Sequence, residues 1–151
     1  MMKYSEKMYK QLNEVLEKTF DAEKGYIKAM SKSKNNKTKM FFKRMTDERA
    51  GFAKDLLQEI SSYGEKPEQN GSLEGVTHRA WIDMKTVFSK HNEEVILEEC
   101  LRGEQIAMNE YDEILKHKND LPPTTVSLLE NHRNEIQKAV NKIQLFEEAN
   151  K

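Results

Sequence analysis

The chain has 151 residues and a mass of 17.7 kDa, a length that fits one domain with a buried core. Its 25 basic and 26 acidic side chains give a net charge of −1, which argues against general nucleic-acid binding. The longest apolar runs are far shorter than the roughly 20 residues that a membrane span needs, so we expect no span and no secretory signal. The single cysteine, Cys100, cannot form an internal disulfide, which favours a cytoplasmic protein.

The first half of the chain predicts two long amphipathic helices. Apolar residues recur there at intervals of three and four, the spacing that places them on one helix face. They predict helices over residues 5–32 and 37–63, joined by a short polar turn. Gly64 follows the second helix and is expected to end it with a positive φ.

The second half predicts a short helix and two more long ones. A short helix over 73–88, which carries Trp81, follows a loop rich in proline and glycine. Asn92 is expected to cap a helix over 92–118, and the last helix is expected over 123–148, with a proline in its first turn.

The lengths of the connections predict how the helices are arranged. Four long amphipathic helices favour a four-helix bundle, and the two shortest links force antiparallel pairs. The connection between the second and third long helices has about 28 residues, which is long enough to cross the bundle from end to end. One long crossover is the ferritin-like arrangement. The sequence therefore predicts an all-α, ferritin-like four-helix bundle formed by residues 1–151 as one domain.

Polar residues inside the apolar stripes are the candidate functional residues. At 100° per residue, Glu23, Glu104 and His132 lie about 20° from the centres of their stripes, and Glu48 lies about 70° away. Counting from the turns places the three glutamates at one height. Glu135 is then level with them, and His132 lies one turn below. We therefore expect one polar layer across the core.

The first interpretation of this layer is a transition-metal site. Unpaired carboxylates in a dry core cost several kcal/mol each unless something neutralises them. Carboxylate oxygens and a neutral imidazole suit iron, manganese or zinc. The candidate ligands are Glu23, Glu48, Glu104 and His132, with Glu135 as a further one. Such a site would serve storage, sensing or a stress-related role.

The alternative interpretation is a metal-free structural or interaction protein. In it, Glu48 pairs with Arg44, Glu104 pairs with a neighbouring cation, and His132 is a hydrogen-bonded core residue. The polar residues then only fix the register of the helices. Under either interpretation we expect a homodimer or small homo-oligomer, no membrane and no nucleic-acid partner.

Two further patterns stand out. Gly25, Gly51 and Gly103 lie inside predicted helices close to the inward carboxylates, which suggests a close approach of helices there or a local bulge. Residues 1–44 contain 12 basic and 5 acidic side chains. The lysines from Lys28 to Lys43 surround the first turn and could meet nucleic acid or another acidic partner, or the opposite-charge half of a second copy, or simply face water.

The polar core residues also carry a family resemblance. Glu23 and Glu48, together with the inward glutamate and histidine of the last two helices, resemble the ferritin-like superfamily. Segments 71–75, 78–83 and 98–104 look more specifically like a bacterial family within it. That family is known as a domain of unknown function and is often described as a stress-associated four-helix bundle.

The resemblance also implies a ligand pattern from which this chain departs. Di-iron ferritin-like proteins take a Glu-x-x-His motif from each of two helices. Here Gly51 stands three residues after Glu48, and Leu129 stands three residues before His132. A full di-iron oxidase centre is therefore not present, and the sequence does not predict an enzyme.

Overall fold

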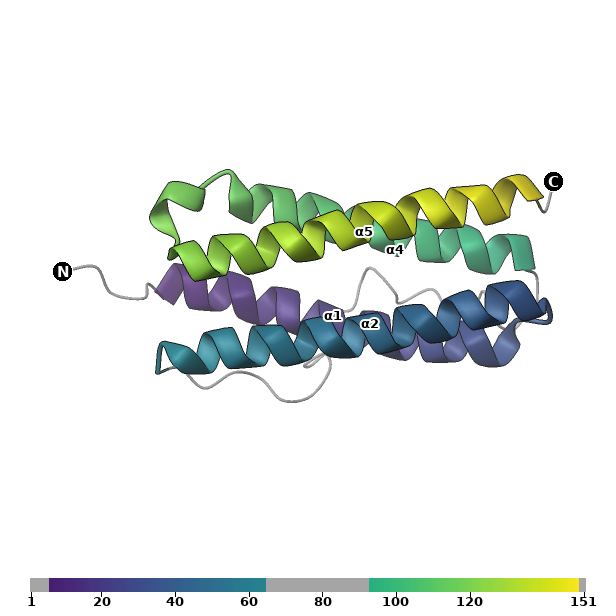
Figure 1. Ribbon diagram of the computed structural model, residues 1–151, viewed down its shortest axis with the longest axis horizontal. Coiled ribbons are helices and arrows are strands. Elements are labelled where there is room, and N and C mark those ends of the chain that lie inside the picture. The colour runs from purple at the N-terminus through teal and green to yellow at the C-terminus, as the bar shows by residue number, and fades with distance from the viewer. Residues whose placement is uncertain (1–5, 65–92, 150–151) are drawn as a thin grey trace.

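The computed structural model describes residues 6–64 and 93–149, which form a bundle of long helices. They are α1 (Glu6–Lys32), α2 (Asn36–Ser62), α4 (Glu93–Leu115) and α5 (Pro123–Ala149), with a 3-10 turn, η2 (Lys118–Asp120), before α5. Figure 1 shows α1 antiparallel to α2 and α4 antiparallel to α5. The predicted all-α four-helix bundle is confirmed. The short helix over 73–88, Trp81 and the Asn92 cap lie outside the described residues, and one domain over the whole chain stays a prediction.

The helix boundaries follow from the residues at each end. The Asn35 side chain caps α2 by accepting the backbone N–H groups of Lys37 at 2.8 Å and Thr38 at 3.2 Å. Gly64 has a φ of 83°, as predicted. The predicted end of the third long helix at 118 is wrong, because α4 ends at Leu115. After Leu115 the chain tightens into a turn and then η2, and Leu121 is extended because it precedes a proline, so the α-helix cannot continue to this point.

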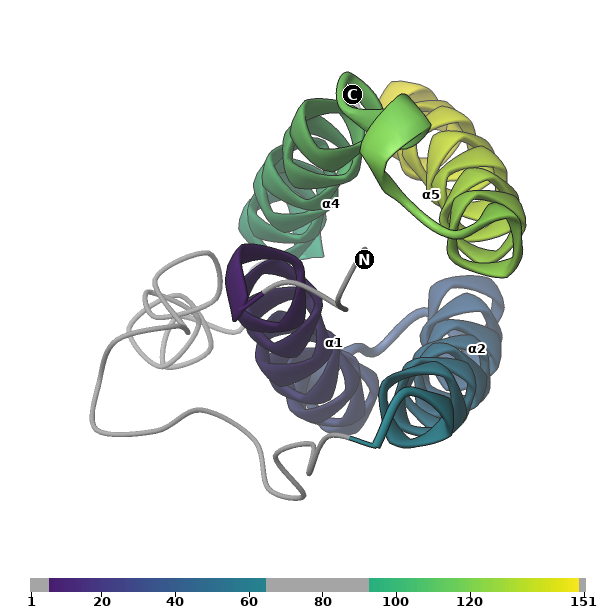
Figure 2. The same cartoon turned by 90° about the vertical axis from the view of Figure 1, so that its left-hand side faces the viewer.

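The order of the helices around the bundle confirms the predicted crossover. Seen end-on in Figure 2, α1 lies beside α2 and α4, and α5 lies beside α4 and α2, so α2 and α4 are diagonal partners. The start of α4 is tied to the α1–α2 turn by the Ser33 hydroxyl, which donates to Glu93 at 2.9 Å. Hence α4 begins at the same end of the bundle as α2. No helix within the described ranges is long and apolar enough to cross a membrane.

The hydrophobic core is divided into two clusters along the bundle. One lies toward the α1–α2 turn and is formed by Ala22, Tyr26, Ala29, Phe41, Phe42, Met45, Ile96, Leu97, Cys100, Ala139 and Ile143. The other lies toward the opposite end and is formed by Met8, Leu12, Val15, Leu16, Phe52, Ala53, Leu56, Ile60, Tyr111, Ile114, Leu129 and Ile136. Along α2 and α4, buried charged residues separate the two clusters, with Arg49 between Met45 and Phe52 and Glu104 between Cys100 and Tyr111.

The structure corrects the expectation that Gly51 marks a close approach of helices. Gly51 is exposed, and a methyl group at that position would meet no heavy atom within 4 Å. Glycine therefore only weakens α2 at this point, because it adds backbone freedom to the unfolded chain.

We expect Gly51→Ala to raise the free energy of unfolding by about 0.5–1 kcal/mol. The measurement is urea denaturation followed by circular dichroism. Gly64→Ala is the matched control, and it should destabilise the protein because the φ of 83° strains any residue with a Cβ atom. A loss of stability in Gly51→Ala would contradict the open surroundings of that position.

Candidate functional site

The centre of the bundle holds an ion pair between diagonal helices. Arg49 of α2 is 2% exposed and Glu104 of α4 is 1% exposed. The Arg49 Nη2 atom donates to both carboxylate oxygens of Glu104, each at 2.6 Å. Because α2 and α4 face each other across the bundle, this bond passes through the middle of the core. A charge-assisted pair of this geometry gives each buried charge its counter-charge.

Aromatic rings complete the surroundings of this ion pair. The Tyr26 hydroxyl of α1 donates a hydrogen bond to Glu104 Oε2. The Arg49 guanidinium carbon lies 4.8 Å from the centre of the Phe52 ring and 6.0 Å from that of Tyr26. Both distances allow a cation–π interaction in a desolvated site. The group thus joins α1, α2 and α4 through polar contacts.

Burial and charge oppose each other in this group. Burial raises the pKa of Glu104 above its ordinary value, although Arg49 and Tyr26 stabilise the ionised form. Burial lowers the pKa of Arg49, but the Glu104 charge more than offsets this, and the net pKa lies above its ordinary value. The arginine therefore stays charged and provides the only partner of full opposite charge that Glu104 contacts among the described residues.

Glu48 lies at the edge of the same group, on the side of α5. Its side chain is 27% exposed, and its Oε1 atom lies 3.4 Å from Arg49 Nη1. The carboxyl group of Glu135, on α5, is close enough to raise the pKa of Glu48. Burial, together with the charges of Glu135 and Glu104, raises the pKa of Glu48 to about 7 against the pull of Arg49. Glu48 is therefore partly protonated at neutral pH.

A second polar group, the histidine group, joins Asp55 of α2, Tyr111 of α4 and His132 of α5. The His132 Nε2 atom lies 3.0 Å from Asp55 Oδ2, and its Nδ1 atom lies 3.0 Å from the Tyr111 hydroxyl. The imidazole stacks on Phe52 with ring centres 3.9 Å apart. A neutral imidazole satisfies both contacts when Nε2–H donates to Asp55 and Nδ1 accepts from Tyr111. Burial lowers the pKa of His132, despite the opposing effect of Asp55.

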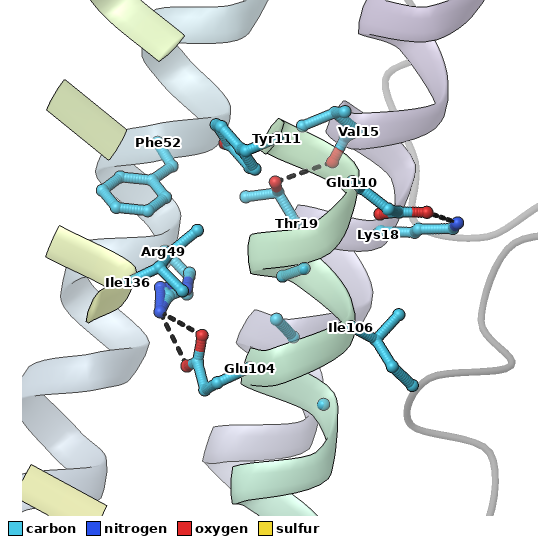
Figure 3. Close-up of a pocket in the computed structure, with 13 residues that line it drawn as sticks. Val15, Lys18, Thr19, Arg49, Phe52, Glu104, Ile106, Glu110, Tyr111 and Ile136 are labelled. Atoms are coloured by element: carbon cyan, nitrogen blue, oxygen red, sulfur yellow. Dashed lines mark hydrogen bonds and ion pairs between the residues drawn. The ribbon is translucent and has the colours of Figure 1, made fainter. Parts of the chain in front are cut away.

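A small cavity between α1 and α4 reaches the ion pair. Its lining includes Thr19, Gly103 and Ala107, and it has about 20 Å³ of room for a water-sized molecule. Figure 3 shows the Arg49–Glu104 pair on one side of it and the Lys18–Glu110 ion pair on the other. This space suits about one water molecule and is too small for a substrate of several heavy atoms.

The structure places the predicted site residues at three different positions. Glu104 and His132 point into the core, as predicted, and Glu48 and Glu135 lie near Glu104 at the α2–α5 side. Glu23 is half-buried, and burial raises its pKa, with Lys24 and Asp47 as the nearby charges. Within residues 6–64 and 93–149, no group of three or more His, Cys, Asp or Glu side chains is arranged to hold a metal ion. The metal site stays a prediction.

Sequence reasoning missed Arg49, the residue that neutralises Glu104. The pattern contained the signal, since Arg49 lies four residues after Met45 and three before Phe52, in the middle of the apolar stripe of α2. Glu48 contacts Arg49 in the structure, where the alternative interpretation expected Arg44. Cys100 is fully buried among apolar residues.

Comparison with known families identifies the chain at the level of its sequence family. The family model described as "Domain of unknown function (DUF2383)" matches residues 7–117. The chain belongs to this family. No curated protein matches the chain. The DUF2383 match covers α1, α2 and α4, and thus includes Tyr26, Arg49 and Glu104 of the central group.

The raised pKa of Glu48 predicts how the stability of this DUF2383 chain changes with pH. The folded chain keeps a proton on Glu48 up to about pH 7, whereas the unfolded chain loses it near its ordinary value of 4.5. The stability that this proton gives is fully present below pH 4.5 and is lost as the pH rises through about 7. After allowance for solvent screening, we expect the contribution of Glu48 to the free energy of unfolding, measured as the difference between the unchanged chain and Glu48→Gln, to be about 0.5 kcal/mol lower at pH 8 than at pH 6.5.

Urea denaturation at the two pH values measures this difference. Glu48→Gln should remove the part of the pH dependence that Glu48 causes, because the amide does not titrate. Glu113→Gln is the matched control, since Glu113 is exposed and pairs only with Lys116 among the described residues. An unchanged pH dependence in Glu48→Gln would contradict the assignment of the proton to Glu48.

Proposed function

We propose that this chain is a metal-independent bundle with a structural or interaction role, in which the core polar residues fix helix register. The observation that carries the proposal is the pairing of Arg49 with both oxygens of Glu104. The Glu104 carboxylate, whose burial suggested a metal ion from the sequence, is already neutralised by Arg49. His132 is likewise engaged at both ring nitrogens.

The geometry supports a role in register because the contacts cannot survive a shift of one helix. A slide by one turn moves a side chain by about 5.4 Å along the bundle axis and would leave two buried charges unpaired. Each uncompensated buried charge costs several kcal/mol, so the alternative registers are strongly disfavoured. The two polar groups together involve all four helices. A ferritin-like ancestry is part of this proposal, and the crossover arrangement of α2 and α4 supports it.

A transition-metal site is the second candidate, favoured by the Glu48–Glu135 pair. Two neighbouring carboxyl groups, one of which keeps its proton up to about pH 7, form a place where a cation would be attracted. Iron, manganese or zinc remain the candidate ions. Glu104 would have to exchange its contacts with Arg49 and Tyr26 to become a further ligand. His132 would likewise have to leave Asp55 or Tyr111.

Metal content and thermal melting decide between the two candidates. Untagged protein is analysed by elemental mass spectrometry, and its melting is followed with a chelator and with added iron(II), manganese(II) or zinc(II). We expect less than about 0.1 metal ion per chain and a melting temperature that neither chelator nor ion changes, since only binding to the folded state shifts it.

The variants for this test are Glu48→Gln and Glu135→Gln, with Glu130→Gln on the exposed face of α5 as the matched control. Near-stoichiometric metal that the first two variants abolish and the control retains would overturn the metal-independent proposal. Self-association, the homodimer or small homo-oligomer expected from sequence, is measured separately by light scattering after size-exclusion chromatography.

A further inference from the structure

The end of the α1–α2 hairpin carries an unusual run of positive charge. Residues 27–44 contain seven basic side chains and no acidic one. We name these seven the basic end. They come from the end of α1, the turn and the start of α2, and are Lys28, Lys32, Lys34, Lys37, Lys39, Lys43 and Arg44. Because α1 and α2 are antiparallel, all seven lie at one end of the bundle (Figure 1).

Most of these cations form no ion pair with another residue that the structure describes. Six of the seven side chains are exposed, and Lys32 is half-buried. Among the described residues, Lys43 alone of the seven forms an ion pair, with Asp47 at 3.2 Å, and both partners are largely exposed, so the pair contributes little. Acidic residues of α4 and α5 lie at the same end of the bundle, and Glu93 accepts hydrogen bonds from the Ser33 hydroxyl and the Lys34 backbone N–H, so the excess positive charge belongs to the α1–α2 side of this end.

Exposed apolar side chains lie among these cations. Met40 is 64% exposed and Ile27 is 45% exposed, and the third large exposed hydrophobic residue of the described ranges, Leu145, is on α5. At 100° per residue, Lys37, Lys43 and Arg44 lie within about 60° of Met40 on the outward face of α2. An exposed methionine with three cations nearby on the same helix face combines an apolar contact with electrostatic attraction.

The composition of the basic end favours a lipid surface over a nucleic acid. Both aromatic residues of the segment, Phe41 and Phe42, are buried in the core and cannot stack on bases. Six of the seven cations are lysines, which act as point charges and lack the bidentate geometry with which arginine reads bases. Lysines attract anionic lipid head groups, and a methionine can enter the head-group region without any membrane span.

We propose that the basic end binds peripherally to the surface of an anionic phospholipid bilayer, with Met40 inserted among the head groups. This contact is a further activity of the chain and does not depend on whether the core binds metal. Each lysine near an anionic surface strengthens binding about fivefold, so removal of three cations should weaken it about 100-fold.

Vesicle sedimentation with the full chain tests the proposal. The vesicles are phosphatidylcholine alone or phosphatidylcholine with about 30% phosphatidylglycerol, in about 50 mM salt. The test variant is Lys37→Gln/Lys39→Gln/Arg44→Gln. The matched control is Lys7→Gln/Lys10→Gln/Lys54→Gln, which removes the same charge from exposed positions outside the basic end. Circular dichroism melting confirms that both variants fold.

The expected result is sedimentation with the anionic vesicles only, weakened about 100-fold in the test variant and less than about threefold in the control. Met40→Ser should weaken binding about fivefold at unchanged charge. The proposal is overturned if the chain ignores anionic vesicles, if test and control variants bind equally, or if labelled duplex DNA binds more tightly than the vesicles and Met40→Ser has no effect.

Discussion

Arg49→Met is expected to lower the free energy of unfolding by about 3–5 kcal/mol at neutral pH. The substitution keeps most of the volume but leaves the Glu104 carboxylate buried, with the Tyr26 hydroxyl as its one remaining hydrogen-bond partner among the described residues. The carboxyl group will then take up a proton, because its pKa, already raised by burial, loses the Arg49 charge that opposes the shift. Urea denaturation followed by circular dichroism measures the loss.

The sign of the pH dependence separates a lost charge pair from lost packing. A carboxyl group with a raised folded pKa favours the folded state below its ordinary value of 4.5, and that stability is lost as pH rises toward the folded pKa. Arg49→Met should therefore be less destabilised near pH 5 than near pH 8. If the variant does not fold at neutral pH, its stability is compared with that of the unchanged chain near pH 5.

The double variant Arg49→Met/Glu104→Leu should recover most of the stability, since replacing both members of a buried pair by apolar residues is often neutral or stabilising. Arg44→Met, on the exposed face of the same helix, is the matched control and should change stability by less than about 0.5 kcal/mol. A single-variant loss below about 1 kcal/mol would contradict a central role of the ion pair.

The helices were predictable because their apolar stripes are long and regular. Each long helix is amphipathic over more than twenty residues, so its start and end could be placed to within a few residues. The largest difference is at the end of α4, which was expected at 118 and lies at Leu115, where the chain tightens toward η2. The crossover was predictable because the number of residues between α2 and α4 matched the length of the bundle.

The candidate site was predictable only in part, because periodicity describes one helix at a time. It identified Glu104 and His132 as inward residues, and both are buried. It did not reveal that Arg49 reaches Glu104, since that contact joins diagonal helices and depends on their height and separation. Arginine in an apolar stripe is easily assigned to the surface, because its long side chain usually carries the charge to water. Its burial here required a carboxylate on a different helix.

His132→Ala is expected to lower the free energy of unfolding by about 2–4 kcal/mol at neutral pH. The change removes the ring stacked on Phe52, leaves a cavity between α2 and α5, and takes a hydrogen-bond partner from the buried Tyr111 hydroxyl. Asn131→Ala, at the neighbouring exposed position of α5, is the matched control and should have little effect. Chemical denaturation of both variants measures the difference.

The same histidine should make the protein less stable in mild acid. Burial lowers the pKa of His132 in the folded chain below its ordinary value of 6.5. Just below pH 6.5 the histidine is therefore protonated in the unfolded chain but still neutral in the folded chain. Stability therefore falls as the pH drops below about 6.5, the reverse of the effect of Glu48 at higher pH.

His132→Phe/Tyr111→Phe keeps an aromatic ring against Phe52 and leaves no hydroxyl unpaired, so it should remove the acid dependence while retaining most of the stability. An NMR titration of the His132 imidazole checks the cause directly, and a midpoint at or above 6.5 would show that burial does not control this histidine.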